Sequence, residues 1–139
     1  MSTYSRAAAV AVAVAIGLVL MVSACGTKTK AARGPFSSRA AEVTTDLGAG
    51  KFDAVAAMFG PVMKGSLSVS RMATDWQGYE VTYGRYRRHG TPKSVMKGQV
   101  DVERVPVTME RGKGEVRVSF DRDGTIAGLY FLKADAPAP

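Results

Sequence analysis

The sequence predicts one α+β domain in which N-terminal helices pack on one face of a curved antiparallel sheet. Apolar residues recur with the helical period of about 3.6 up to residue 83, and with the strand period of two from residue 85 onward. Glycine-containing turns separate the later segments. The chain of 139 residues has room for one small domain. We expect its sheet to contain about four strands.

The first expected helix begins at Ser37 or Ser38, either of which can cap its N-terminus, and continues to Leu47. Phe36 stands directly before it, where its ring can pack against the first turn. Residues 48–50 read Gly-Ala-Gly and predict the end of this helix, because glycine is favoured just beyond a helix C-terminus.

Two further helices are expected. A short one covers Lys51 or Phe52 to Phe59 and ends at Gly60-Pro61, because proline disfavours helix in the residue before it. A longer one runs from about Val69 to Tyr83, with Ser68 as its cap. One face of this third helix should lie on the sheet, opposite the alternating apolar residues of strand 115–121. The side chains on that face are Met72, Trp76, Tyr79 and Tyr83.

Strand alternation follows, in the segments 85–90, 93–97, 99–110, 115–121 and 125–133. Val102 and Val105 are three residues apart, so we expect a bulge near Glu103-Arg104, and Pro106 indicates an edge or distorted position. Turns are expected at residues 112–114 and at Asp121-Arg122-Asp123-Gly124. Residues 134–139 have the composition of a disordered tail.

The N-terminus has the pattern of a secretory signal. Arg6 precedes residues 7–22, which contain no charged or polar side chain. Val22-Ser23-Ala24-Cys25 then resembles the lipobox of bacterial lipoproteins, and this resemblance implies cleavage after Ala24 and a diacylglycerol anchor on Cys25, with acylation of the new N-terminus by a fatty acid such as palmitate. An ordinary signal peptide is the alternative, because residues 22–24 also fit a small-x-small cleavage site.

We therefore divide the chain into a signal peptide (1–24), a lipidated flexible tether (25–37), an α+β domain (38–133) and the tail. The full chain has 19 basic and 12 acidic residues, but without Arg6 and the four cations of residues 26–41 the balance is 14 to 12. The basic character belongs mostly to the tether, which suits an anionic membrane surface and makes nucleic acid a poor candidate partner. The expected location is the outer side of a bacterial cytoplasmic membrane.

Several motifs spread over residues 38–133 resemble an uncharacterised domain of secreted bacterial proteins, often found ahead of an α/β-hydrolase domain. They are Phe52-Asp53-Ala54-Val55, Met58-Phe59, Trp76, Tyr83-Gly84, Val105-Pro106-Val107, residues 116–121 and residues 123–131. That domain is similar in turn to nuclear transport factor 2-like (cystatin-like) cone folds, so the resemblance implies a curved sheet around a cavity. The nucleophile elbow Gly-x-Ser-x-Gly of the hydrolases does not occur in this sequence.

Candidates for catalysis are few. His89 is the only imidazole, and its neighbours in Arg85-Tyr86-Arg87-Arg88 favour a solvated basic surface or a site for an acidic group. Asp101 and Glu103 share one side of a strand, which we interpret as solvated surface. With one His and one Cys the sequence offers almost no zinc ligands, and we expect no metal or other cofactor.

The aromatic face of the third helix has two interpretations. Its side chains form either the core or the lining of a pocket, to which Tyr86 and Tyr130 would add. The function we expect is a non-catalytic binding or accessory module for a small apolar ligand, an envelope component or a partner protein. The alternative is a small cone-fold enzyme that uses an acid and a Tyr in an internal cavity. The residues named as pocket candidates are Met72, Trp76, Tyr79, Tyr83, Tyr86 and Tyr130.

Overall fold

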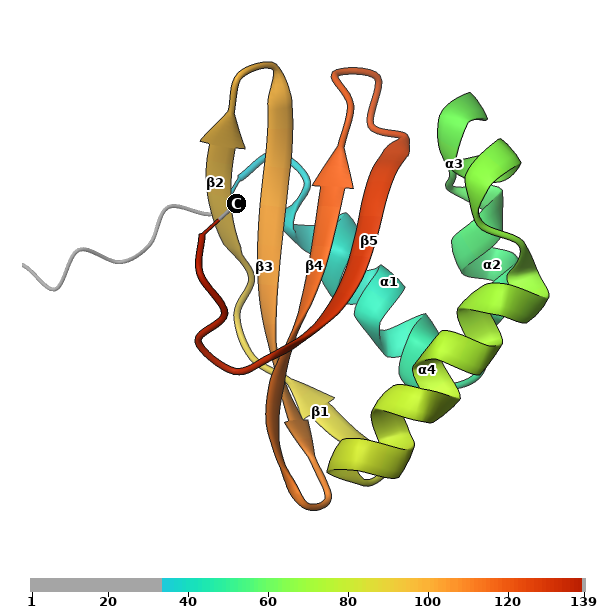
Figure 1. The fold of residues 1–139 in the computed structure, drawn as a ribbon. Helices are drawn as coiled ribbons and strands as arrows, with labels where there is room; N and C mark the ends of the chain where they lie inside the picture. The colour runs from blue at the N-terminus through green and yellow to red at the C-terminus, as the bar shows by residue number, and fades with distance from the viewer. Residues whose placement is uncertain (1–33, 139) are drawn as a thin grey trace, which may run out of the picture.

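The computed structural model describes residues 34–138, and within them four helices pack against an open antiparallel sheet of five strands (Figure 1). This confirms the α+β class. The expected signal peptide, Cys25 and most of the tether lie outside the described residues. The elements are α1 (Ser37–Gly48), α2 (Phe52–Ala57), α3 (Pro61–Ser66), α4 (Val69–Tyr83), β1 (Tyr86–His89), β2 (Lys93–Lys97), β3 (Val100–Met109), β4 (Gly112–Phe120) and β5 (Ile126–Lys133).

The start of α1 differs from the expected serine cap. Phe36 holds the cap position, and no side chain accepts a hydrogen bond there. The Ser37 hydroxyl instead donates a hydrogen bond to Glu103 Oε1 at 2.8 Å. Phe36 stacks on Phe120 of β4, with ring centroids 5.0 Å apart. Contacts with the sheet therefore replace the local contacts that the sequence predicts, whereas the expected end of the helix is confirmed by Gly50, with φ +72° just beyond it.

The helix α3 is absent from the sequence prediction. Pro61, expected to follow the end of the preceding helix, is the first residue of α3. Proline is favoured at this position because the first N–H groups of a helix have no partner within it. Phe59, expected in the second helix, lies beyond α2 and forms a parallel bridge with Ile126. None of the helices within residues 34–138 is long and apolar enough to cross a bilayer.

The sheet is centred on β3. Both β1 and β2 pair with β3 along one side, and β4 and then β5 follow on the other. Pairing of β3 with β4 is continuous from Asp101 opposite Phe120 to Met109 opposite Gly112, so the expected bulge in β3 is absent. The alternation does not slip, because Asp101 and Glu103 occupy the helix-facing positions that valines occupy further along the strand.

Pro106 lies opposite an interruption of the edge formed by β2 and β1. Pairing with β2 ends at Arg104, and pairing with β1 begins at Val107. The Pro106 carbonyl accepts a hydrogen bond from the Gly90 N–H at 2.7 Å, but its own nitrogen has no hydrogen to donate on that side. The proline therefore breaks the strand beside β3 and leaves β3 itself regular.

The turn between β3 and β4 is shorter than expected. Because Met109 pairs with Gly112, the turn consists of Glu110 and Arg111, and the expected turn residues 112–114 belong to β4. Gly114 lies against α4, where a Cβ would overlap the Tyr79 hydroxyl. Glycine is therefore needed there for close approach of the helix, and not for a turn.

The core lies between the helices and the sheet. The α4 helix has the predicted bounds, and the Ser68 hydroxyl accepts a hydrogen bond from the Arg71 N–H as expected of a cap. Trp76 is 2% exposed and belongs to the same buried cluster as Val116 and Val118 of β4. This confirms the predicted position of Trp76 between α4 and the sheet.

Candidate functional site

The aromatic face of α4 is largely core. The Trp76 ring lies 5.1 Å from the ring of Phe131, 5.7 Å from that of Tyr79 and 6.2 Å from that of Tyr86. Tyr83 packs against the same cluster and is partly exposed. Large rings at these distances fill the space around Trp76, which favours the core interpretation of this face.

The tyrosine hydroxyls do not point into one common space. The Tyr79 hydroxyl donates a hydrogen bond to the Leu132 carbonyl at 2.7 Å, and burial raises the pKa of Tyr79 to about 12. Burial also raises the pKa of Tyr86, although hydrogen bonds oppose the shift. Tyr130 is 56% exposed and lies opposite Arg117, on the side of the sheet away from the helices.

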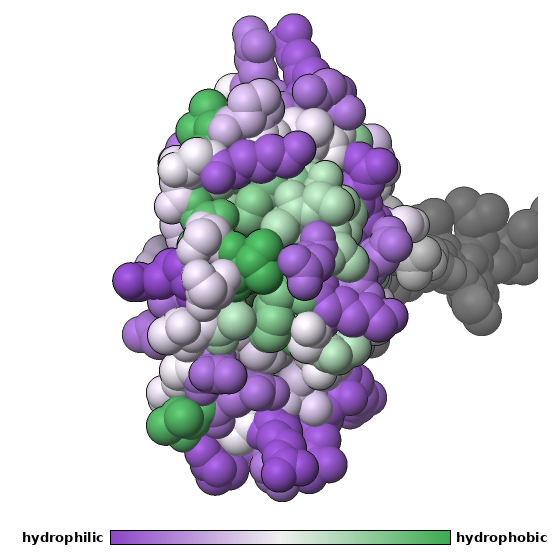
Figure 2. All heavy atoms as spheres, turned by 90° about the vertical axis from the view of Figure 1, so that its right-hand side faces the viewer, coloured by the Kyte–Doolittle hydropathy of each residue, from purple (hydrophilic) through white to green (hydrophobic). Residues whose placement is uncertain are grey.

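A shallow recess between α4 and β5 does bring some of the six pocket candidates together. It has a volume of about 510 Å³, and Met72, Tyr79 and Tyr130 contribute to its lining. Trp76, Tyr83 and Tyr86 do not line it. Figure 2 views this side of the molecule and shows apolar side chains gathered near its centre, with hydrophilic ones around them. Leu67, Leu129 and Phe131 are partly buried apolar residues that also line the recess.

Asp101 and Glu103 are buried, which corrects their interpretation as solvated surface. Asp101 is 3% exposed and Glu103 is 0% exposed. One oxygen of each carboxyl accepts a hydrogen bond, from Ser94 at 2.6 Å and from Ser37 at 2.8 Å, and the other oxygen has no partner. Burial raises the pKa of Glu103, the Ser37 hydroxyl lowers it, and the Asp101 charge raises it further. Both acids brace β2 and the start of α1 against β3.

The face of the sheet opposite the helices, called here the outer face, carries a buried ionic cluster. Glu115 is 6% exposed and lies between two arginines. Its carboxylate accepts hydrogen bonds from Arg104 Nη2 at 2.7 Å and from Arg117 Nε at 2.8 Å. Burial alone would raise the pKa of Glu115, but the hydrogen bonds and charges of both arginines outweigh it and lower this pKa.

The same arginines hold the end of the chain. Arg104 Nη2 donates to the Ala136 carbonyl and Arg117 Nη2 to the Pro137 carbonyl, both at 2.9 Å. Ala136 is 8% exposed as a result. Residues 134–138, for which composition predicts disorder, therefore lie against the outer face. The composition of the tail cannot predict this contact, because Arg104 and Arg117 lie 20 or more residues earlier in the sequence, on β3 and β4.

We expect Glu115→Gln to lower the free energy of unfolding at pH 7 by roughly 1.5–3 kcal/mol, because the charge-assisted hydrogen bonds from Arg104 and Arg117 are weakened. The folded-state pKa of Glu115 is lowered, so this stabilisation is present above the unfolded-state pKa of about 4.3 and is lost as the pH falls through the folded-state value. Urea unfolding at pH 7 and pH 3 measures the difference. Glu42→Gln, at an exposed position on α1, is the control. Equal effects of Glu115→Gln at both pH values would contradict the assignment.

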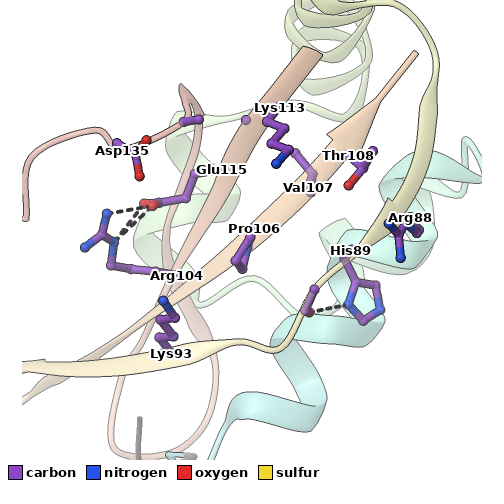
Figure 3. Close-up of a pocket in the computed structure, with 13 residues that line it drawn as sticks. Arg88, His89, Lys93, Arg104, Pro106, Val107, Thr108, Lys113, Glu115 and Asp135 are labelled. Atoms are coloured by element: carbon purple, nitrogen blue, oxygen red, sulfur yellow. Dashed lines mark hydrogen bonds and ion pairs between the residues drawn. The ribbon is translucent and has the colours of Figure 1, made fainter. Parts of the chain in front are cut away.

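Beside this cluster, the interruption opposite Pro106 forms a recess of about 500 Å³ on the outer face (Figure 3). Arg104 and Glu115 form one end, with Ala134 and Asp135 of the tail nearby, and Lys93 and Lys113 lie on either side of Pro106. His89 also lines the recess, and its Nδ1 lies 2.8 Å from the Gly90 carbonyl. Its remaining lining residues are Arg88, Gly90, Pro106, Val107, Thr108 and Gly114.

A second recess on the outer face is mainly apolar and has a volume of about 480 Å³. Val100, Val102 and Leu132 form its floor, and Lys97 and Tyr130 also line it. Arg117 and Ser119 complete its lining. The outer face thus offers a basic and an apolar recess on either side of the buried cluster. Within residues 34–138 no group of three or more His, Cys, Asp or Glu side chains is placed to hold a metal ion.

Comparison with known proteins gives a family match. The profile of a family described as "Protein of unknown function (DUF3887)" matches residues 40–129. The chain is also similar to Esterase EstD of Thermotoga maritima, with 23% identity over 101 residues. This alignment covers 73% of the chain but 24% of the esterase's length. No solved structure matches the chain.

Proposed function

Because the chain belongs to the DUF3887 family of proteins of unknown function, its role must be inferred from its surfaces, and we propose that it is a non-catalytic binding module of the bacterial cell envelope. In this proposal a lipid on Cys25 anchors it outside the cytoplasmic membrane, and residues 25–37 tether the domain. The outer face of the sheet binds an envelope component or a partner protein.

The observation that carries the proposal is the outer face itself. Helices cover the other face of the sheet, while this one holds the buried Glu115 and Arg117 and the partly buried Arg104, with residues 136 and 137 of the C-terminal segment bound to the two arginines. Buried charged groups are costly unless they are paired, and here Glu115 pairs with both arginines, which keeps charged groups ordered at the centre of this face. A basic and an apolar recess adjoin the cluster, which suits a ligand with both an acidic and an apolar part.

The similarity to an esterase over a quarter of the esterase's length supports an accessory role. We propose that domains of this kind bind beside a catalytic domain and do not perform its chemistry. The helical layer on one side of the sheet is compatible with a nuclear transport factor 2-like cone, here with its interior occupied by the rings around Trp76. A fold-level likeness of this sort is an analogy and carries no activity.

A cone-fold enzyme that uses an acid and a tyrosine is the weaker proposal. Glu103 has the burial and the raised pKa expected of a general acid. The Tyr79 hydroxyl, however, lies against Gly114, which is in register with Val107, four residues from Glu103 along β3. That separation is roughly 13 Å at the strand rise of about 3.3 Å per residue. Glu103 and Tyr79 are therefore too far apart to act on one substrate bond.

Photo-cross-linking in intact cells tests the proposal. A cross-linking amino acid replaces Lys97 on the outer face, or Thr74, an exposed residue that lines the recess between α4 and β5. We expect adducts from position 97 and none from position 74, with the full chain expressed at its native level. Adducts from position 74 alone, or from neither position, would contradict binding on the outer face.

A further inference from the structure

We propose that the basic recess beside Pro106 binds a phosphate group, held over Thr108 between Arg88 and Lys113. This inference rests on the proposed function, because it names the ligand chemistry of one part of the outer face. The shared chemistry is a phosphomonoester or inorganic phosphate, from a soluble molecule or from a lipid headgroup.

Strand register places the three side chains in one row. Arg88 of β1 is opposite Thr108 of β3, and Thr108 is opposite Lys113 of β4. Neighbouring strands are about 4.8 Å apart, so one cation stands on each side of the Thr108 hydroxyl within reach of the same anion. All three residues line the recess. The threonine hydroxyl and the two cationic side chains can all donate hydrogen bonds, and phosphate oxygens can accept them.

Lys93 adds a third cation from across Pro106 (Figure 3). Lys93 is opposite Arg104, which precedes Pro106 by two residues on β3 and therefore lies on the same outer face. The recess exists at this point because Pro106 has no N–H to donate to an edge strand on that side, and residues 90–92 belong to neither β1 nor β2. The interruption therefore creates both the space for a ligand and the ring of cations around it.

The charge balance of the recess favours a dianion. Its lining contains Arg88, Lys93, Arg104 and Lys113 against Glu115 and Asp135, four basic groups to two acidic ones. Glu115 already pairs with Arg104, whereas Arg88, Lys93 and Lys113 form no ion pair with any acid of the described residues. A phosphomonoester carries a charge near −2 at pH 7, which matches this excess better than a carboxylate does.

The test uses the full chain in phosphatidylcholine nanodiscs and follows the amide NMR signals of Thr108 and Lys113. Inorganic phosphate is titrated against it, with acetate as the monoanion for comparison. In a second arm, one-tenth of the lipid is replaced by phosphatidic acid. The variant K93Q/K113Q removes two recess lysines, and K64Q/K133Q removes two lysines that do not line the recess as a charge-matched control.

We expect phosphate to shift the Thr108 and Lys113 signals, with binding roughly tenfold weaker in K93Q/K113Q and unchanged in K64Q/K133Q. Shifts with inorganic phosphate identify a soluble source, and shifts with phosphatidic acid alone identify a lipid headgroup; either supports the site. No shift with any probe, equal binding of acetate, or equal weakening in both variants would overturn it.

If position 97 still cross-links while phosphate fails to bind, only the phosphate assignment is wrong. Loss of the cross-links from position 97 would instead count against the proposed function.

Discussion

Trp76→Ala is expected to lower the free energy of unfolding by roughly 3–5 kcal/mol. Trp76 is 2% exposed and contacts aromatic rings from α4, β1 and β5, so truncation leaves a cavity where three elements meet. The total stability of a domain of this size is about 5–15 kcal/mol, so much of the protein would unfold at moderate temperature. Thermal and urea unfolding of a fragment covering residues 34–139 measures the change.

Val81→Ala is the matched control, because Val81 belongs to the same helix and is 76% exposed. Its effect should stay within about 0.5 kcal/mol. If Trp76→Ala melts like Val81→Ala, Trp76 does not pack between the helix and the sheet. If it melts normally but loses partner binding, the aromatic face of α4 is a binding pocket.

Cys25→Ala is expected to abolish membrane attachment through a lipid and to leave an uncleaved precursor or a released protein. The reason is that the lipobox-like segment ends at Cys25, the only thiol in the chain, and two or more acyl chains hold a protein stably on a bilayer. Cell fractionation together with mass spectrometry of the N-terminal peptide measures the outcome. Thr27→Ala, two residues further on, should remain lipidated. An unmodified Cys25 thiol in the native protein would contradict the lipoprotein proposal.

The sequence predicts those elements whose signals are local. The cap and aromatic stripe of α4, the strand β4 with Val116, Val118 and Phe120 in the core, and the hairpin at residues 121–124 are all observed, the last with Gly124 at φ +80°. The misassigned parts depend on distant partners. A proline such as Pro61 can follow the end of one helix or begin another. The residues around it decide which of the two occurs, and here Pro61 begins α3.

The interpretation of Asp101 and Glu103 of β3 as solvated surface is also wrong because it depends on partners that are distant in the sequence. Counting only apolar residues suggests a bulge at Glu103, because Asp101 and Glu103 look like surface residues. Ser94 and Ser37 supply hydroxyl donors from other elements, and these allow the acids to be buried in register. The polar positions of β3 and β4, which alternate with the core valines, were the available signal for the outer face.

We infer that side chains fill the space between the helices and the sheet, and we propose that ligands therefore bind on the outer face. Trp76 is the only tryptophan in the chain, so its fluorescence reports on that interior directly. We predict emission typical of a buried indole, protected from iodide quenching and unchanged when phosphate or the cross-linked partner is added. Ready quenching of the free protein, or a shift of the emission on binding, would show an accessible internal pocket and contradict the claim.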